Sequence, residues 1–424
     1  MTGPADHLPP MPVAAPPWSA PSDIEQALHE AKTRGDWPAY FDVLAGTDLF
    51  MVVARASADA HPDSVVFTPS WNPQAHIACL AVFTEGMLPA PAEDPVFQGY
   101  SLGWYARVWE DRDPPFLVVN PGSPCEGVLP ATPAHRAVWH QHAERLTTGD
   151  SCCNRVHGRL RALHVGGPLH GPVAHGLACG AHLSVRNGEL WNALAYHGGG
   201  YRHERRRLED SWGVTGRQGW LNAQEQLLKA DMVSGVWEFT LGIRRSLARD
   251  FAGHVDLEYW RNAAERVIRQ RSDRSGDVEI TPEGVTTVEA PDAAEVESQV
   301  TGVRKLIGRI ARYEARFRAD GVLPEGAFVR TAQAWDYGRA SGMARWGLGA
   351  RYCTLPEAEQ AVLRAGRAAR ANYRSWEEFS AAFILGRCLH FDEEEFGPWY
   401  TDMLAAHQVL STDPASPWLN IPWK

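Results

Sequence analysis

The stretch AWDYGRASGMARWG, residues 334–347, decides the fold of the larger part of this chain. Trp335, Gly338, Gly342 and Trp346 follow one another at intervals of three, four and four residues, the spacing of one face of an α-helix. Two indoles therefore bracket a groove of glycines, where a second element can pack close to the backbone. The stretch predicts a central helix in a helical domain.

More helices are predicted on both sides of this stretch. Residues 354–357 (TLPE) and 375–378 (SWEE) have the capping-box spacing, in which a hydroxyl and a carboxylate satisfy the first backbone N–H groups of a helix. Upstream, the apolar residues of 296–317 keep helical spacing. We therefore predict a mainly helical domain over residues 175–424, with a polar insertion at 272–292.

The helix predicted after residue 375 carries a charge toward apolar surroundings. Arg387 shares a helical face with two phenylalanines, and a buried charge needs a partner. Asp336 and Glu377 are the expected partners, while Arg339 is the alternative partner of Asp336 on its own helix. Such a cluster either binds an anionic or amide group or clamps helices together, and we favour the structural interpretation. The candidate cluster comprises Trp335, Asp336, Arg339, Trp346, Ser375, Trp376, Glu377 and Arg387.

The first part of the chain has a different pattern. Residues 1–21 contain seven prolines and are predicted to be a disordered leader. Residues 22–131 begin with a capped helix and continue as short apolar runs separated by turns, which predicts an α/β-mixed domain. Residues 132–174 are rich in histidine and broken by glycine and proline, so we interpret them as a linker. The predicted fold class is α+β, with a mainly α-helical C-terminal domain.

Composition narrows the classes of function. With 424 residues, 44% hydrophobic and 22% charged, the chain has the profile of a soluble globular protein. A net charge of −10 argues against nucleic acid as a partner, because binding a polyanion needs a clustered positive surface. The seven cysteines lack framework spacing, which favours the cytoplasm, and the sequence predicts no membrane span. We interpret the 17 tryptophans as large anchors between helices.

Histidine clustering raises the alternative of a metal site. Ten of the 17 histidines fall within residues 135–203, and His175, Cys179 and His182 would share one helical face. Their spacing matches no standard zinc pattern, so we interpret them as core or surface residues. Signatures of a nucleophile elbow, a phosphate-binding loop and a zinc protease are absent from the sequence. No catalytic residue, cofactor or metal ligand is assigned.

Short motifs in residues 22–131 resemble the SseB-type N-terminal domain. They are IEQAL at 24–28, GDW at 35–37, VFT at 66–68, VFT at 82–84 and, most specific of all, VNPGSP at 119–124. The family name derives from a secretion-system component, so the resemblance implies a protein-binding module and no catalytic residues. Read by itself, the Asn-Pro-Gly turn also has a structural explanation, because Pro-Gly suits the centre of a type II turn.

Motifs in residues 175–424 are similar to the family catalogued as domain of unknown function 1266 (YbeU/YbeR-like). They are SWGV at 211–214, AWD at 334–336 with Arg339, RWG at 345–347, YRSWE at 373–377 and LGR at 385–387. The resemblance implies an α-helical domain and supplies no activity.

Together these features predict a cytoplasmic protein-binding module of unknown biochemical activity, acting on an unidentified protein partner. The context is secretion, toxin immunity or regulation. The alternative is that the helical domain is an enzyme or toxin-like effector, with Asp336, Glu377, Arg339 and Arg387 in a cleft between helices.

Overall fold

A computed structural model gives the arrangement of most of the chain. It describes residues 18–61, 65, 67–73, 76–89, 95–147, 158–163, 167–194, 201–250, 255–273, 278–281, 284–287, 292–393 and 395–424. Most of the predicted leader, and parts of the predicted linker and polar insertion, lie outside the described residues.

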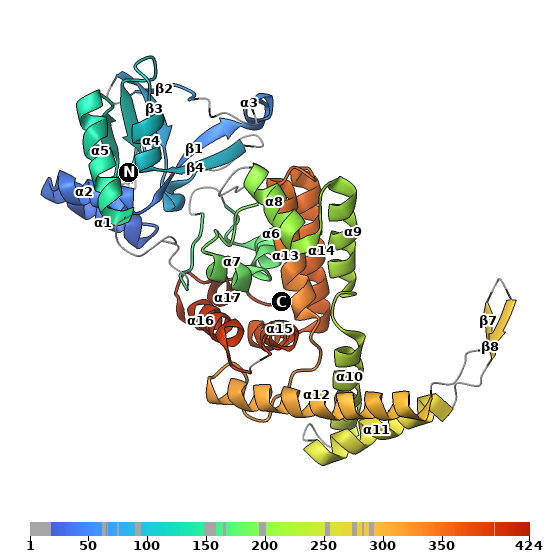
Figure 1. Cartoon of the computed structure of the whole chain (residues 1–424). Coiled ribbons are helices and arrows are strands. Elements are labelled where there is room, and N and C mark those ends of the chain that lie inside the picture. Colours follow the sequence, from blue (N-terminus) through green and yellow to red (C-terminus); the bar gives the residue numbers. More distant parts are fainter. Residues whose placement is uncertain are drawn as a thin grey trace, which may run out of the picture.

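The N-terminal part combines helices with small sheets (Figure 1). Its main sheet has the strand order β2-β3-β5-β6, in which β3 and β5 are parallel and the other pairs antiparallel. Strands β1 and β4 form an antiparallel ribbon, which a bridge between Phe50 and Phe83 joins to the end of β3. The elements are α1 (Asp23–Arg34), α2 (Trp37–Ala45), β1 (Asp48–Ala54), α3 (Arg55–Ala60), β2 (Ser70–Asn72), β3 (Ile77–Val82), η1 (Glu85–Met87), β4 (Pro95–Ser101), α4 (Leu102–Val108), β5 (Phe116–Val119), β6 (Gly127–Pro130) and α5 (Pro133–Thr147).

The Asn-Pro-Gly turn after β5 has a structural role in this part. Asn120 takes a positive φ of 49°, and its side-chain oxygen accepts a hydrogen bond of 2.8 Å from the backbone N–H of Thr84. The hydroxyl of Thr84 in turn donates to the buried carboxylate of Glu25, which also accepts from the backbone N–H of Gly86 at 3.2 Å. The turn therefore ties α1 to the sheet through buried polar groups.

Helix α5 lies where the sequence predicts a linker. It packs against α2 and α4, and its Trp139 is fully buried with its ring 5.9 Å from that of Trp109, edge to face. The structure differs from the prediction here because one tryptophan anchors a helix whose other residues are mostly polar or charged.

The C-terminal part is mainly helical, as predicted. Its core helix α13 packs against α9, α14 and α15. The elements are α6 (Gly171–Ala178), α7 (Ala181–Asn187), α8 (Tyr201–Trp212), α9 (Arg217–Lys229), α10 (Gly235–Asp250), α11 (Leu257–Asp273), β7 (Val278–Thr281), β8 (Gly284–Thr287), α12 (Ala293–Ala319), α13 (Ala334–Gly349), α14 (Leu355–Asn372), α15 (Trp376–Phe391), α16 (Pro398–Thr412) and α17 (Pro417–Asn420).

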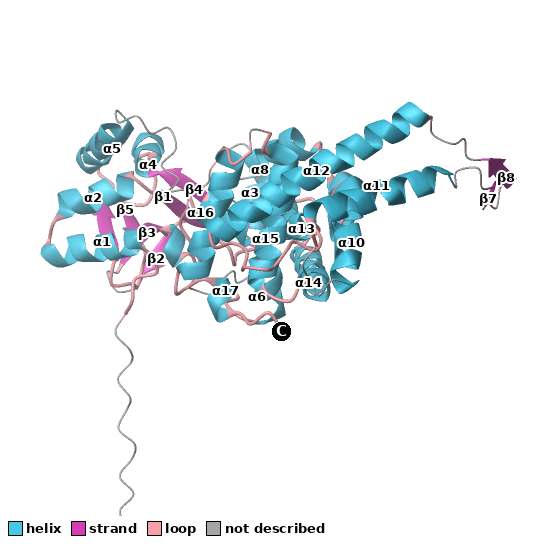
Figure 2. Cartoon of the chain, turned by 90° about the horizontal axis from the view of Figure 1, so that it is seen from below, coloured by secondary structure: helices cyan, strands magenta, loops and turns pink. Residues whose placement is uncertain are grey.

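Helices α11 and α12 form an arm that leaves the body of the helical part, with the β7–β8 hairpin at its tip (Figures 1 and 2). The predicted periodicity of residues 296–317 is confirmed, since the apolar face of α12 is buried. A bidentate ion pair between Arg244 of α10 and Glu314 of α12, with N–O distances of 2.6 and 2.7 Å, fixes the root of the arm. No described helix has both the length and the apolar character required to cross a bilayer.

The two parts of the chain meet at a small apolar cluster. Phe50 and Phe97 of the β1–β4 ribbon pack with Leu190 and Ala193, which follow α7. Arg345 of α13 holds the backbone of the same segment, donating to the carbonyls of Leu190 and Ala193 at 2.5 and 2.9 Å. The ribbon therefore rests on a segment that is fixed to the central helix.

Candidate functional site

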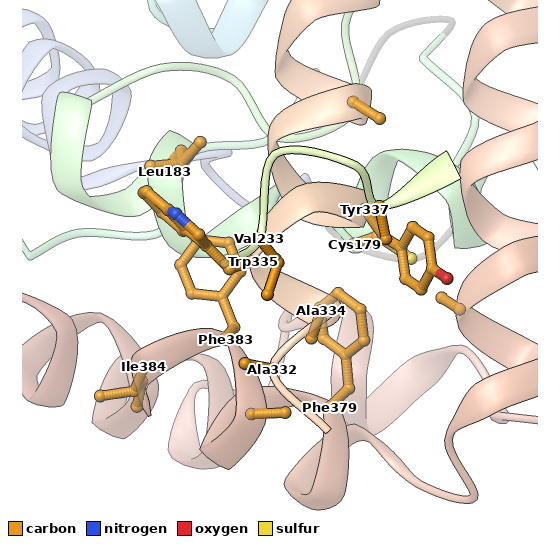
Figure 3. Close-up of a cluster of buried hydrophobic side chains, with 14 of the residues drawn as sticks. Cys179, Leu183, Val233, Ala332, Ala334, Trp335, Tyr337, Phe379, Phe383 and Ile384 are labelled. Carbon is orange, nitrogen blue, oxygen red and sulfur yellow. The ribbon is translucent and has the colours of Figure 1, made fainter. Parts of the chain in front are cut away.

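Helix α15 packs on the predicted glycine groove of α13 at Gly338, whereas Gly342 lies under the ring of Trp346 of the same helix. A Cβ atom on Gly338 would collide with the ring of Phe383, and one on Gly386 would lie 2.6 Å from Cβ of Trp335. Glycine at these two places therefore allows close approach of the two backbones. The rings of Trp335 and Phe383 meet edge to face with centroids 5.1 Å apart (Figure 3).

Asp336 lies at the centre of the candidate cluster and is fully buried. Its Oδ2 atom accepts hydrogen bonds from the backbone N–H groups of Met232 and Val233, at 3.0 and 2.9 Å. Its Oδ1 atom pairs with the guanidinium of Arg339, which confirms the alternative pairing predicted from the sequence. Asp336 thus joins α13 to the turn before α10 and has donors on both oxygens.

Burial governs the electrostatics of this pair. It raises the pKa of Asp336 above its usual range although Arg339 and the two N–H groups favour the charged form. It likewise lowers the pKa of Arg339 despite the attraction of Asp336. The pair is therefore a clamp between elements, held at a cost in desolvation.

Arg387 is not paired with either expected carboxylate. Asp336 is taken by Arg339, and Glu377 is exposed near the start of α15. Among the described residues Arg387 makes no ion pair and donates no hydrogen bond, and its Nε atom is shielded from solvent. The predicted pairing of Arg387 is therefore wrong: nearly three helical turns separate Glu377 from it, and Asp336 is held by Arg339 and two backbone N–H groups.

Aromatic rings take the place of a counter-charge around Arg387. The guanidinium carbon lies 4.9 Å from the ring centroid of Trp399, 5.4 Å from that of Trp335 and 5.5 Å from that of Phe391. A second guanidinium contacts the same indole, since the guanidinium carbon of Arg339 lies 4.3 Å from the ring centroid of Trp335. Cation–π contacts thus stabilise two guanidinium groups on one indole.

The surroundings of Arg387 are electropositive. Burial and the nearby charges of Arg186 and Arg339 lower its pKa to about 10, although Asp402 acts in the opposite direction. Arg339 and Arg387 also add to the burial that lowers the pKa of His390, one helical turn along α15. A negatively charged group placed beside Arg387 would therefore be attracted by these arginines.

Comparison with known proteins places this site within a family. The model of a family described as "Protein of unknown function (DUF1266)" matches residues 207–423, more than half of the chain. The chain belongs to the DUF1266 family. Neither the curated proteins nor the solved structures contain a match.

The DUF1266 match covers the whole candidate cluster. It begins 32 residues later than the 175 predicted from the resemblance, so α6 and α7 lie outside it. It does not reach residues 22–131, where the SseB-type resemblance stays a prediction.

Two further members of the cluster hold the end of the DUF1266 chain in place. Ser375 caps α15 by accepting from the backbone N–H of Glu378 at 3.2 Å. The indole of Trp376 stacks on Trp418, with centroids 5.8 Å apart, and meets Trp423 edge to face at 4.7 Å. Its Nε1 atom donates to the carbonyl of Ile421 at 2.9 Å. The C-terminal tail therefore packs on its own domain.

Trp346, the last cluster member, belongs to a separate contact. Arg207 of α8 lies 4.7 Å above its ring and pairs with Glu189 at 2.9 Å. Arg345 also approaches Glu189, with an N–O distance of 3.6 Å. Attraction to the two arginines keeps the pKa of Glu189 below its usual range despite burial. Trp346 thus marks the junction of α8 and α13 and lies apart from Arg387 in its contacts.

The histidines do not form the helical face that the metal alternative required. The chain breaks between α6 and α7 at Cys179 and Gly180, so His175 and His182 lie on different helices. His175 packs between Trp376 and Trp423, and His182 stacks on Phe383. Among the residues with described positions, no group of three or more His, Cys, Asp or Glu side chains could hold a metal ion.

The sequence did not predict one row of three buried polar side chains. Ser380 of α15 lies between two histidine rings, 2.9 Å from Nε2 of His182 and 2.8 Å from Nδ1 of His407. All three side chains are buried, and burial lowers the pKa of both histidines. The sequence signal was weak, because the three residues lie on three separate helices.

Proposed function

We propose that this DUF1266 protein is a cytoplasmic protein-binding module acting in secretion, toxin immunity or regulation. The observation that carries the proposal is an apolar groove between α10 and the hairpin-side parts of α11 and α12. The SseB-type resemblance of residues 22–131 is a second, independent support, since it implies a protein partner.

The groove lies between three helices and is open to solvent. It has a volume of about 640 Å³ and is lined mainly by apolar or small side chains, among them Val236 and Phe239 of α10, Ile268 of α11, and Gly302 and Val303 of α12. Val236 is 52% exposed. Grooves of this size and character are typical of binding sites, and exposed apolar patches mark interaction surfaces.

The chemistry of the groove favours an amphipathic helix of another protein. A Cβ atom on Gly235 or Gly302 would meet no heavy atom within 4 Å, so apolar side chains of a partner can reach the floor. Arg271, which lies over the ring of Phe239 at 4.8 Å, supplies a positive charge in the lining. We therefore expect a partner helix with apolar residues on the face that enters the groove.

The alternative prediction of an enzyme or effector needed Asp336 and Glu377 to face a cleft with Arg387. Asp336 is saturated by donors and Glu377 is exposed away from Arg387, so this geometry gives the alternative less support.

Filling the groove tests the proposal. Gly302→Leu places a side chain in the groove without a clash, whereas Gly242→Leu adds the same side chain to α10 outside the lining. Tagged full-length variants are expressed in the native cytoplasm, and bound proteins are identified by mass spectrometry. We expect one protein to be retained by the wild type and Gly242→Leu and lost from Gly302→Leu, and to crosslink to a photoreactive residue at position 236.

Two results would contradict the proposal. Equal capture by all three proteins would show that the groove is not the binding surface. Self-association that Gly302→Leu abolishes, measured by sedimentation, would make a second copy of the chain the occupant instead of a separate partner.

A further inference from the structure

Arg387 is a buried charge whose hydrogen-bonding capacity is unused. Its side chain is only 4% exposed, and no described residue accepts a hydrogen bond from any of its nitrogens. Nε is shielded from solvent, whereas the two terminal nitrogens are not completely shielded. A guanidinium presents these two nitrogens as a planar fork, which matches the two oxygens of a carboxylate.

The neighbouring charges are already balanced. Arg339 is paired with Asp336, and Arg186 is paired with Asp402 at 3.0 Å while lying over the ring of Trp399 at 5.5 Å. Subtracting these two ion pairs leaves the single positive charge of Arg387. Among the described residues, Arg387 therefore lacks an ion-pair partner, and the planar fork of its guanidinium matches a carboxylate.

The aromatic rings beside Arg387 can contact the apolar part of a ligand. Phe391 is 38% exposed and stacks on Trp399, with ring centroids 4.7 Å apart. A ligand whose carboxylate meets the fork of Arg387 can place a flat or apolar group against these rings.

We propose that Arg387, with Trp399 and Phe391, forms a binding site for an organic carboxylate carrying an apolar group. The site is separate from the groove on α10, α11 and α12, and the proposal does not depend on that groove. The same carboxylate chemistry can come from a free acid or from the C-terminus of a polypeptide.

Calorimetric titration of the full chain with benzoate, at neutral pH and low ionic strength, tests the site. We expect saturable binding with one site per chain. Arg387→Met should weaken it at least tenfold, and Arg387→Lys should weaken it less, because an ammonium keeps the charge but loses the planar fork. Arg217→Met is the matched control: Arg217 is exposed and paired with Glu357, so its loss should leave benzoate binding unchanged.

Further titrations distinguish the sources of the carboxylate. A peptide ending in phenylalanine that binds more tightly than benzoate, and that loses binding as its C-terminal amide, would assign the site to a polypeptide terminus. Benzoate binding with no gain from the peptide would assign it to a free acid.

Three outcomes would overturn the proposal: no saturable binding of either probe, equal binding by Arg387→Met, or preference for inorganic phosphate over benzoate. If Arg387→Met fails to fold, Arg387→Lys and Phe391→Ala serve as the variants, and unchanged binding by both would overturn it equally.

Discussion

Replacing Arg387 by methionine should stabilise the protein. Burial and neighbouring arginines hold the pKa of Arg387 at about 10, more than two pH units below the ordinary value of about 12.5 for arginine. At about 1.4 kcal/mol for each pH unit, keeping this group charged costs about 3 kcal/mol. The three contacts of the guanidinium with aromatic rings offset part of this cost, at about 0.5–1 kcal/mol each. Methionine fills a similar volume without charge, so we expect a net gain of about 1–2 kcal/mol.

Chemical denaturation at pH 7 measures this gain directly. Because the pKa is lower in the folded state than in the unfolded chain, the cost is fully present below about pH 10 and fades only as the pH rises above that value. The difference between Arg387→Met and the wild type should therefore stay constant from about pH 6 to pH 9. A loss of more than about 1 kcal/mol in Arg387→Met would refute the reasoning, since it would mean that the charge has a stabilising partner.

Two further predictions concern the buried polar groups. Asp336→Ala should lower the free energy of unfolding by about 3–5 kcal/mol, because it leaves Arg339 buried without a counter-charge. Arg112→Ala, which breaks the exposed pair with Glu110, should cost no more than about 1 kcal/mol, and equal costs would contradict the clamp. Burial lowers the pKa of His175 to about 4, so the unfolded chain takes up the proton first as the pH falls below about 6.5. The wild type should lose about 3 kcal/mol from this group between pH 6.5 and 4, and denaturation of His175→Phe across that range should show a correspondingly smaller loss.

The sequence predicted features that depend on neighbours along one helix. The caps at Ser375 and Thr354 and the pair Asp336–Arg339 could be predicted from the sequence, because each joins residues three apart. Close packing at Gly338 could be predicted for the same reason. A glycine on a helical face lets another element approach the backbone, and this holds whichever element it is.

Contacts between elements were much harder to predict from the sequence. The surroundings of Arg387 depend on how α13, α15 and α16 cross, which no spacing in the sequence encodes. Strand β4 depends on a distant strand, β1, for its backbone partners, and short apolar runs in the sequence do not show that pairing. The break between α6 and α7 at Cys179 and Gly180 was not predicted either, because these residues lie in an otherwise apolar run that suits a continuous helix.

The central claim is that the candidate cluster contains one clamp, Asp336–Arg339, and one cation that awaits a ligand, Arg387. The most direct test is the free energy of unfolding of the wild type and of Arg387→Met, each measured with and without benzoate at ten times its dissociation constant for the wild type. A ligand that binds only the folded state adds about 1.4 kcal/mol at this concentration. We predict that gain in the wild type and none in Arg387→Met. An equal gain in both proteins, or none in either, would contradict the account.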